Sequence, residues 1–222
     1  MTTAVAGSVR RPAPPGLRAS LRQFTTFPSA RWLAGMLLGV VSARLLLGGW
    51  GVRDAVIVGA LVAAQPFTEW LIHVYVLHAK DPPGRRRRDL GIAHSHRRHH
   101  QAPKDMRYVF IALPALKGFA VLDALLLVLA WRTARPGIAT AVAVATALTL
   151  AYEWTHWLIH TDYQPRSRLY RGLWRAHRLH HFRNENYWYG VTGHLGDRLL
   201  RTYPAKEEVP LSPTATTLGV SL

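Results

Sequence analysis

The sequence contains no cysteine, which excludes disulfide bonds, thiolate zinc sites and cysteine-ligated iron–sulfur clusters. It also contains no G-x-G-x-x-G motif, so no dinucleotide-binding site is predicted within the chain. Any electrons for redox chemistry would therefore have to come from a separate protein. Acidic residues are scarce as well: 12 Asp and Glu stand against 28 Lys and Arg, and the formal net charge is +16.

A positive charge of this size would suit a protein that binds nucleic acid. The distribution of the charge argues against that function, because the basic residues flank long apolar segments instead of gathering on one soluble face. Apolar segments bordered by basic loops are typical of proteins that cross a membrane several times. We therefore predict an integral, multi-pass membrane protein that binds no nucleic acid.

Four apolar segments are candidates for membrane-spanning helices. The expected spans are residues 32–50, 55–78, 118–131 and 137–160. The third is the shortest, because Pro114 and Lys117 suggest a separate interfacial piece before it. The only charged residue in the first is Arg44. The spans form two hairpins.

Lys and Arg are unevenly divided between the two sides of these hairpins. They crowd the lead, residues 79–107 and residues 161–222, whereas the opposite connections carry only Arg53, Arg132 and Arg135. The positive-inside rule then places both termini, and both histidine-containing segments that follow the hairpins, in the cytoplasm. The expected domains are a flexible cytoplasmic lead (1–30), a membrane domain (31–205) and a flexible tail (206–222).

Histidines form two similar clusters in the sequence. Each cluster contains Glu-Trp, a histidine pair at the end of an apolar segment, a basic connection and H-x-x-H-H, and WLIH occurs in both. Ten of the twelve histidines belong to them: His73, His78, His96, His99, His100, His156, His160, His177, His180 and His181. A repeat of this kind predicts two halves that face each other around a two-metal site.

The histidine spacing predicts which imidazoles lie on one face. At about 100° per residue, each H-x-x-H-H places three rings within an arc of about 100°, and His156 and His160 project together. His73 and His78 are five residues apart, which suits a regular helix poorly, so we expect local unwinding or a bulge there. Ten ligands divided over two metals give five each. Imidazole binds zinc, iron, copper and nickel, so ligand type alone does not name the metal.

Other polar residues have less specific interpretations. Glu69 and Glu153 precede the histidine pairs and are candidates to accept the second ring N–H of a ligand histidine; the alternative is pairing with an arginine at the membrane surface. His94 and His194 lie outside the repeated pattern, and we expect neither to be a ligand. Residues 85–88, all arginine, are interpreted as an anchor on anionic lipid headgroups or as a docking patch for an acidic electron-transfer protein.

The order of these boxes, HX4H, HXXHH, HXXXH and HXXHH, resembles the fatty acid hydroxylase/sterol desaturase superfamily, and most of all the fatty acid (sphingolipid) 2-hydroxylases. Residues 99–110 (HHQAPKDMRYVF) resemble that group's HH-x-x-P-x-D-x-x-R-x-V run. Residues 189–203 (YGVTGHLGDRLLRTY) resemble its GVT…D…T segment. The chain departs from the group in lacking a fused cytochrome b5 domain, and in Gly196 and Arg201–Thr202, where a Trp and a Gly-Thr are usual.

The resemblance implies an all-α membrane protein with four transmembrane helices in two hairpins and a cytoplasmic, histidine-rich cap that holds two iron ions. It further implies an O2-dependent hydroxylase of a lipid alkyl chain, with the 2-position of a fatty acyl chain favoured and with electrons from a separate electron-transfer protein. Zinc fits the same ligands but has no redox chemistry. The alternatives are a carotenoid or sterol-type lipid hydroxylase and, from another class, a non-catalytic metal-binding membrane protein with a structural dizinc cap.

Overall fold

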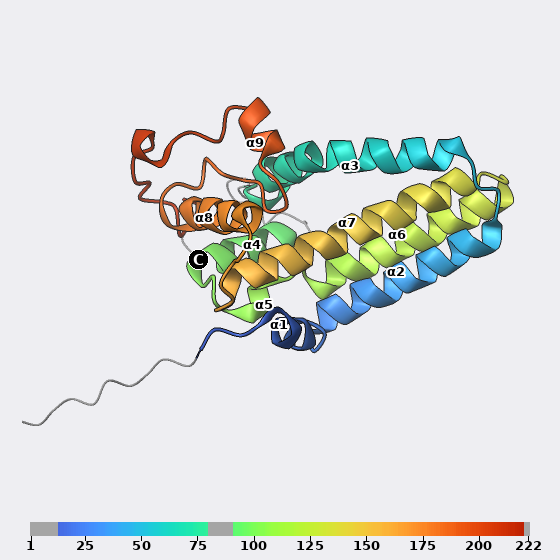
Figure 1. Ribbon diagram of the computed structural model, residues 1–222, viewed down its shortest axis with the longest axis horizontal. Helices are drawn as coiled ribbons and strands as arrows, with labels where there is room; N and C mark the ends of the chain where they lie inside the picture. The colour runs from blue at the N-terminus through green and yellow to red at the C-terminus, as the bar shows by residue number, and fades with distance from the viewer. Residues whose placement is uncertain (1–12, 80–90, 220–222) are drawn as a thin grey trace, which may run out of the picture.

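The computed structural model describes residues 13–79 and 91–219, which form helices and no strand (Figure 1). The arginine run at residues 85–88 lies outside the described residues. The helices are α1 (Leu17–Phe24), α2 (Pro28–Leu47), α3 (Val52–Ile72), a π-helix (His73–Leu77), α4 (Ile92–Gln101), α5 (Met106–Val109), α6 (Leu113–Arg132), α7 (Pro136–His160), α8 (Arg168–Phe182), α9 (Leu195–Leu199) and a 3-10 turn (Lys206–Glu208). The prediction of an all-α fold is confirmed.

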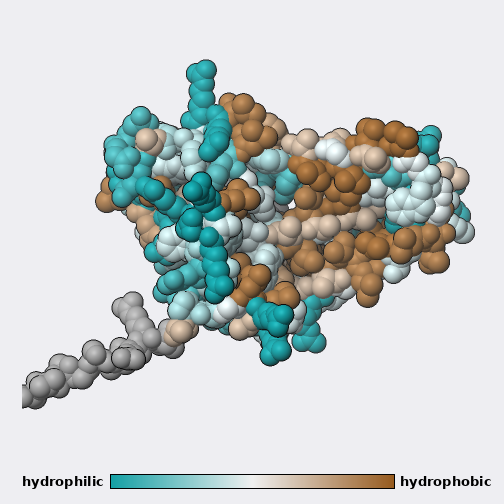
Figure 2. All heavy atoms as spheres, viewed as in Figure 1, coloured by the Kyte–Doolittle hydropathy of each residue, from teal (hydrophilic) through white to brown (hydrophobic). Residues whose placement is uncertain are grey.

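Four helical stretches within the described residues are long and apolar enough to cross a membrane: Pro28–Leu47, Val52–Leu77, Met106–Arg132 and Pro136–His160. α2 turns into α3, and α6 turns into α7, at the same end of the bundle, while α4 and α8 lie at the other end (Figure 1). α7 packs against α2, α3 and α6. Hydrophobic residues cover the long helices, and hydrophilic residues gather over the end that carries α4 and α8 (Figure 2). We call this end the cap.

The third span is longer than the sequence suggested. α6 begins at Leu113 and continues to Arg132, with Pro114 in its first turn and Lys117 in its second. Proline fits a first turn because its missing N–H would have no partner within the helix there. The expected break before Gly118 is therefore wrong.

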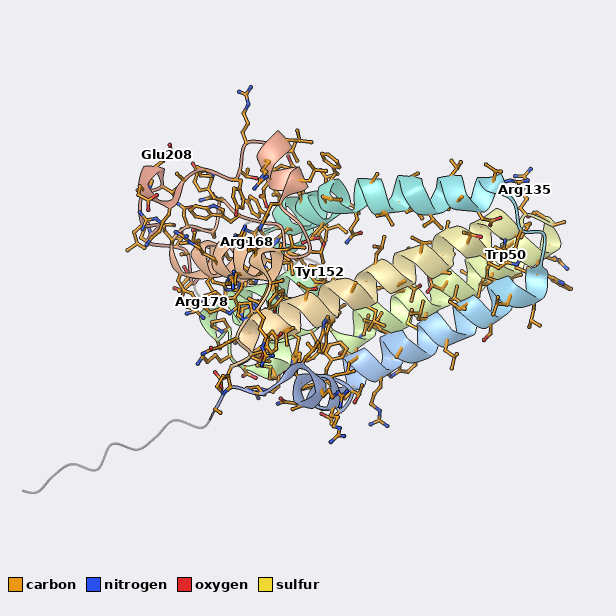
Figure 3. The ribbon with its side chains drawn as sticks, viewed as in Figure 1. Trp50, Arg135, Tyr152, Arg168, Arg178 and Glu208 are labelled. Atoms are coloured by element: carbon orange, nitrogen blue, oxygen red, sulfur yellow. The ribbon has the colours of Figure 1, made fainter. Side chains whose placement is uncertain are left out.

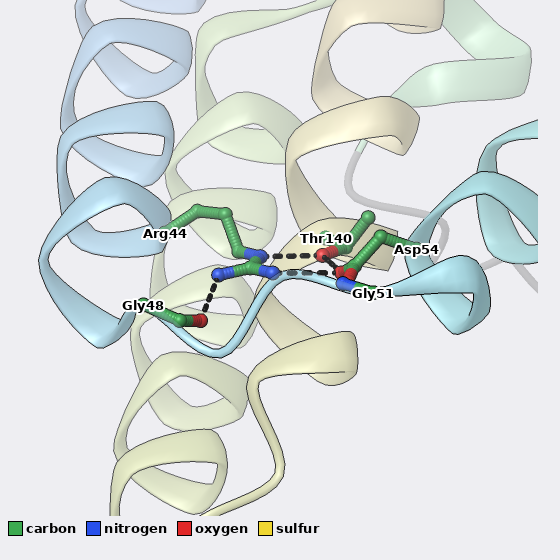
Figure 4. Close-up of polar contacts among 5 residues, drawn as sticks. All are labelled: Arg44, Gly48, Gly51, Asp54 and Thr140. Atoms are coloured by element: carbon green, nitrogen blue, oxygen red, sulfur yellow. Dashed lines mark hydrogen bonds and ion pairs between the residues drawn. The ribbon is translucent and has the colours of Figure 1, made fainter.

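Arg44 is paired at the end of the bundle opposite the cap (Figure 4). Its guanidinium donates to Thr140 Oγ1 at 2.5 Å, to Asp54 Oδ1 at 2.8 Å and to the carbonyl oxygen of Gly48 at 2.6 Å. It also lies 3.6 Å from the ring centroid of Trp50, and the residue is only 2% exposed. These contacts join α2, α3 and α7, and they compensate a charge that would otherwise be costly at this depth.

Replacing Arg44 with Met is expected to lower the thermal unfolding temperature, because Asp54 would lose the partner that it holds at 2.8 Å. The measurement is thermal unfolding of the protein in detergent. The double change Arg44→Met and Asp54→Leu removes both charges and should lose less stability than the single change. Equal losses in the single and double variants would contradict the pairing argument.

Candidate metal centre

All ten predicted ligands meet in the cap, where they form two groups of five histidines. Within each group, one nitrogen from every ring lies within 4.8 Å of the others, so each group could hold a metal ion. The first group is His73, His78, His96, His100 and His180, and the second is His99, His156, His160, His177 and His181. His94 and His194 belong to neither group. Figure 3 shows many side chains crowded at this end of the molecule, around the labelled Tyr152, Arg168 and Arg178.

The two groups do not coincide with the two halves of the sequence repeat. His99 comes from the first half but lies in the second group, and His180 comes from the second half but lies in the first. Each is the middle histidine of its H-x-x-H-H box. Consecutive side chains on a helix point about 100° apart, so His99 and its neighbour His100 point toward different groups. Neither half completes a group alone.

The second group has ring nitrogens at distances that fit ligands of one ion. The Nε2 of His160 lies 3.1 Å from Nε2 of His99 and 2.9 Å from Nε2 of His177. The Nε2 of His177 in turn lies 3.0 Å from that of His181. A ring nitrogen offers either one proton or one lone pair, so these contacts cannot all be ordinary hydrogen bonds. Two nitrogens about 2.1 Å from a common ion, at a right angle, would lie about 3.0 Å apart.

Backbone carbonyls fix the orientation of four of the rings. The Nδ1 atoms of His73, His100, His156 and His180 lie 2.7, 2.9, 2.9 and 2.8 Å from the carbonyl oxygens of Tyr189, Ala215, Val109 and Tyr187. A carbonyl only accepts, so Nδ1 carries the proton and Nε2 carries the lone pair. The Nε2 atoms of these four rings are buried and have no hydrogen-bond partner among the described residues. A bound cation would satisfy them.

Burial keeps the rings of the cap helices in the form that binds metals. It lowers the pKa of His100 to about 4. It also lowers the pKa of His96, His99 and His177 well below the usual value, and neighbouring histidines lower these three pKa values further. These imidazoles are therefore neutral near pH 7, and a neutral imidazole is the metal ligand.

The pairing of His73 and His78 depends on the π-helix. The N–H of His78 donates to the carbonyl oxygen of His73 at 3.0 Å, five residues earlier. This bonding adds one residue to the turn, so side chains five apart face the same way. The two ring centroids are 4.8 Å apart. The expected local unwinding or bulge at this position is confirmed, in the form of a π-helix.

Glu69 acts on His73 through a loop. Its carboxylate accepts the backbone N–H of Val191 and both the N–H and the hydroxyl of Thr192. The same loop presents the carbonyl of Tyr189, two residues before Val191, to His73. The sequence suggested direct contact between carboxylate and imidazole; in the structure a backbone carbonyl occupies that place on the ring.

Glu153 repeats this arrangement in the second half. Its carboxylate oxygens accept the backbone N–H of Ile111 at 3.1 and 3.3 Å. The carbonyl of Val109, two residues earlier, faces His156. Both carboxylates are buried, at 5% exposed for Glu69 and 1% for Glu153. The repeat therefore extends beyond the histidines to the segments that hold them.

Asp197 is a site residue that the sequence analysis missed. It is 1% exposed and accepts the N–H groups of Tyr189 and Gly190 at 3.0 and 2.7 Å and the hydroxyl of Thr202 at 2.6 Å. A Cβ at Gly190 would lie 2.0 Å from a backbone oxygen, so only glycine fits this fold of the loop. The signal was present, because Asp197 and Thr202 are the D and T of the GVT…D…T segment.

Gly196 has a steric role although it departs from the pattern of the 2-hydroxylases. A Cβ at this position would lie 2.3 Å from the carbonyl oxygen of Pro66 in α3. α9 therefore packs directly on the backbone of α3. The indole N–H of Trp70, also on α3, donates to the Thr202 hydroxyl at 2.9 Å and joins the same two segments.

Residues 206–219, which we expected to form a flexible tail, pack on the cap. Val209 and Ala215 are 2% and 3% exposed, and the carbonyl of Ala215 faces His100. The N–H of Ser212 donates to the carbonyl of Arg183 at 2.7 Å, and the Arg183 guanidinium donates to the carbonyl of Val209 at 2.8 Å. The apolar residues of the segment account for this packing.

A cavity of about 40 Å³ touches both histidine groups. Its wall includes His96 of the first group and His156 of the second, and Tyr152 lies against His156 with ring centroids 5.6 Å apart. The remaining wall consists of Leu77, Ile92, Ser95, Tyr108, Val109, Phe110, Ile111 and Ala112. The cavity is mostly apolar and admits only a small group.

Because each half contributes one histidine to the other half's group, the number of metal ions retained by double variants can be predicted. The double variant His99→Ala/His160→Ala disrupts one group and should retain about one ion per chain. The double variant His78→Ala/His99→Ala disrupts both groups, although both residues belong to the first half, and should retain almost none. Elemental analysis of the purified proteins measures this, with His94→Ala as the control that keeps two ions. Equal metal content in the two double variants would contradict the grouping.

Glu69→Ala is expected to weaken metal retention by about tenfold, because the loop that orients His73 loses its anchor. Glu69→Gln keeps an acceptor oxygen and should weaken it less. Titration with a chelator, followed by the bound metal, gives the comparison. Glu207→Ala, at an exposed carboxylate of the cap, serves as the control; a loss as large as that in Glu69→Ala would refute a specific role for Glu69.

Comparison with family models matches residues 58–202 to "Fatty acid hydroxylase". The matched region contains both histidine groups, Glu69, Glu153 and Asp197. Comparisons with curated proteins and with solved structures gave no match.

Proposed function

The chain belongs to the fatty acid hydroxylase family, and we propose that it is an O2-dependent membrane hydroxylase of a lipid alkyl chain, with the 2-position of a fatty acyl chain as its target. The observation that carries this proposal is the pair of five-histidine groups, in which buried lone pairs converge at two adjacent points. These groups supply the ten donor nitrogens that the proposed dimetal site requires.

The ten histidines would hold two iron ions. Bound iron would supply the redox chemistry in which one oxygen atom of O2 enters a C–H bond as hydroxyl and the other leaves as water, at the expense of two electrons and two protons. Zinc suits the same imidazoles without supplying this chemistry. The chain itself keeps the rings neutral, oriented and shielded from water.

The cavity beside both groups is the proposed position of the reacting carbon. Its apolar wall fits an alkyl group, and its volume suits one part of a chain rather than a whole chain. A carbon at the 2-position lies next to a carbonyl, so polar partners are needed nearby. The hydroxyl groups of Ser95 and Tyr152, both on the cavity wall, are candidates to donate to that carbonyl.

The acyl chain would reach the cavity along α3. The only buried residues of α3 are Asp54 near its start and Glu69 near its end, so the intervening turns are not closely covered by the protein. Lipid can therefore approach this helix over most of its length. Leu77, which follows α3 in the π-helix, lines the cavity.

We propose that the cap and both termini face the cytoplasm, because Lys and Arg gather on the cap side. A separate electron-transfer protein would approach from that side. A cavity of about 210 Å³ there is lined by His160 together with two cations, Lys104 and Arg178, and one carboxylate, Asp162. Positive side chains beside a proposed ligand favour an acidic partner.

The test is mass spectrometry of lipids extracted from cells that express the protein in iron-replete medium. We expect a new acyl species with one added oxygen, and fragmentation should locate the hydroxyl at the 2-position. His180→Ala should abolish the species, whereas His94→Ala should keep it. If no lipid gains oxygen even with an added electron donor, and the protein holds two zinc ions, the structural dizinc alternative replaces this proposal. A hydroxylated sterol or carotenoid would identify another substrate class.

A further inference from the structure

An apolar groove of about 650 Å³ lies between α1, α2 and α7, away from the histidines. Small residues widen it, namely Ala34 of α2 and Ala147 and Ala151 of α7. Arg31, near the start of α2, also lines it. Arg31 also borders a second groove of about 590 Å³, whose wall includes Trp32. One exposed cation thus lines both apolar grooves.

The first groove does not lead to the metal centre. Phe24 meets Trp154 edge to face, with ring centroids 5.1 Å apart, and lies 5.5 Å from the ring centroid of Trp157. Trp157 is fully buried. No histidine is among the residues that line the groove. An occupant would therefore be separate from the substrate of the proposed reaction.

The position of Arg31 suits a lipid headgroup. α2 is a candidate membrane span, and Arg31 lies in its first turn on the cap side. Among residues 13–79 and 91–219, no carboxylate pairs with Arg31. α1, whose Leu21 lines the groove, also carries the exposed Arg18 and Arg22. A cation at the membrane surface attracts anionic headgroups.

We propose that this surface is a binding site for one two-chain anionic phospholipid. The phosphate would lie on Arg31, and the two acyl chains would occupy the two grooves on either side of it. An anionic headgroup matches the charge of Arg31, Arg18 and Arg22, and two chains match two apolar grooves that share one cation. The bound lipid would cover α1 and fix it against α2 and α7.

Native mass spectrometry of the delipidated protein in detergent tests the proposal. The probes are phosphatidylglycerol and phosphatidylcholine with identical acyl chains. The protein should bind one phosphatidylglycerol about fivefold more tightly than phosphatidylcholine. Arg31→Gln should remove this preference, and Arg31→Lys should keep it. Ala151→Leu fills the groove and should weaken binding of both lipids.

Arg168→Gln is the matched control, because Arg168 is an exposed arginine of the cap outside both grooves. It should bind both lipids as the unmodified protein does. Equal affinity for the two lipids, or an unchanged preference in Arg31→Gln, would overturn the proposal. A dimer that dissociates in Ala151→Leu would also overturn it and assign the groove to a second copy of the chain.

Discussion

Ring nitrogens that are buried without a hydrogen-bond partner impose the main constraint on this structure. Four rings have a buried Nε2 atom without a partner: His73, His100, His156 and His180. In the second group, three pairs of Nε2 atoms also lie only 2.9–3.1 Å apart. Buried polar atoms without partners are destabilising. A bound cation would therefore stabilise the cap, and metal binding would be thermodynamically linked to cap folding.

The residues around the histidines hold the rings in place through two successive sets of hydrogen bonds. A carbonyl orients each of four imidazoles, and a buried carboxylate fixes the loop that carries the carbonyl in two of these cases. Asp197 adds a second anchor to the loop at Tyr189. The membrane helices supply the carboxylates and the first histidine pairs, so the bundle and the cap are one structural unit. At the far end of the bundle, the Arg44 pair fixes three of the same helices.

Much of the site could be predicted from local spacing. The H-x-x-H-H boxes determine which side of a helix carries the ligands, and the five-residue interval between His73 and His78 requires a departure from the regular helix, which the π-helix provides. Contacts between distant segments could not be predicted in this way. Nothing local indicates that His99 and His180 exchange groups, that Glu69 meets the loop at Val191, or that residues 206–219 cover His100. These depend on how the helices pack.

The exchange of His99 and His180 has a consequence for the origin of the repeat. Each half supplies four histidines to one group and one to the other. A single ancestral half, as an isolated chain, would have left both groups incomplete. Two copies related by a twofold axis would have completed both groups. Each copy would have contributed the middle histidine of its H-x-x-H-H box to the group formed mainly by the other copy. A symmetric dimer of half-length chains is therefore the simplest ancestor that could already hold two metals. Gene duplication with fusion would then have placed both halves, with the exchanged histidines, in one chain.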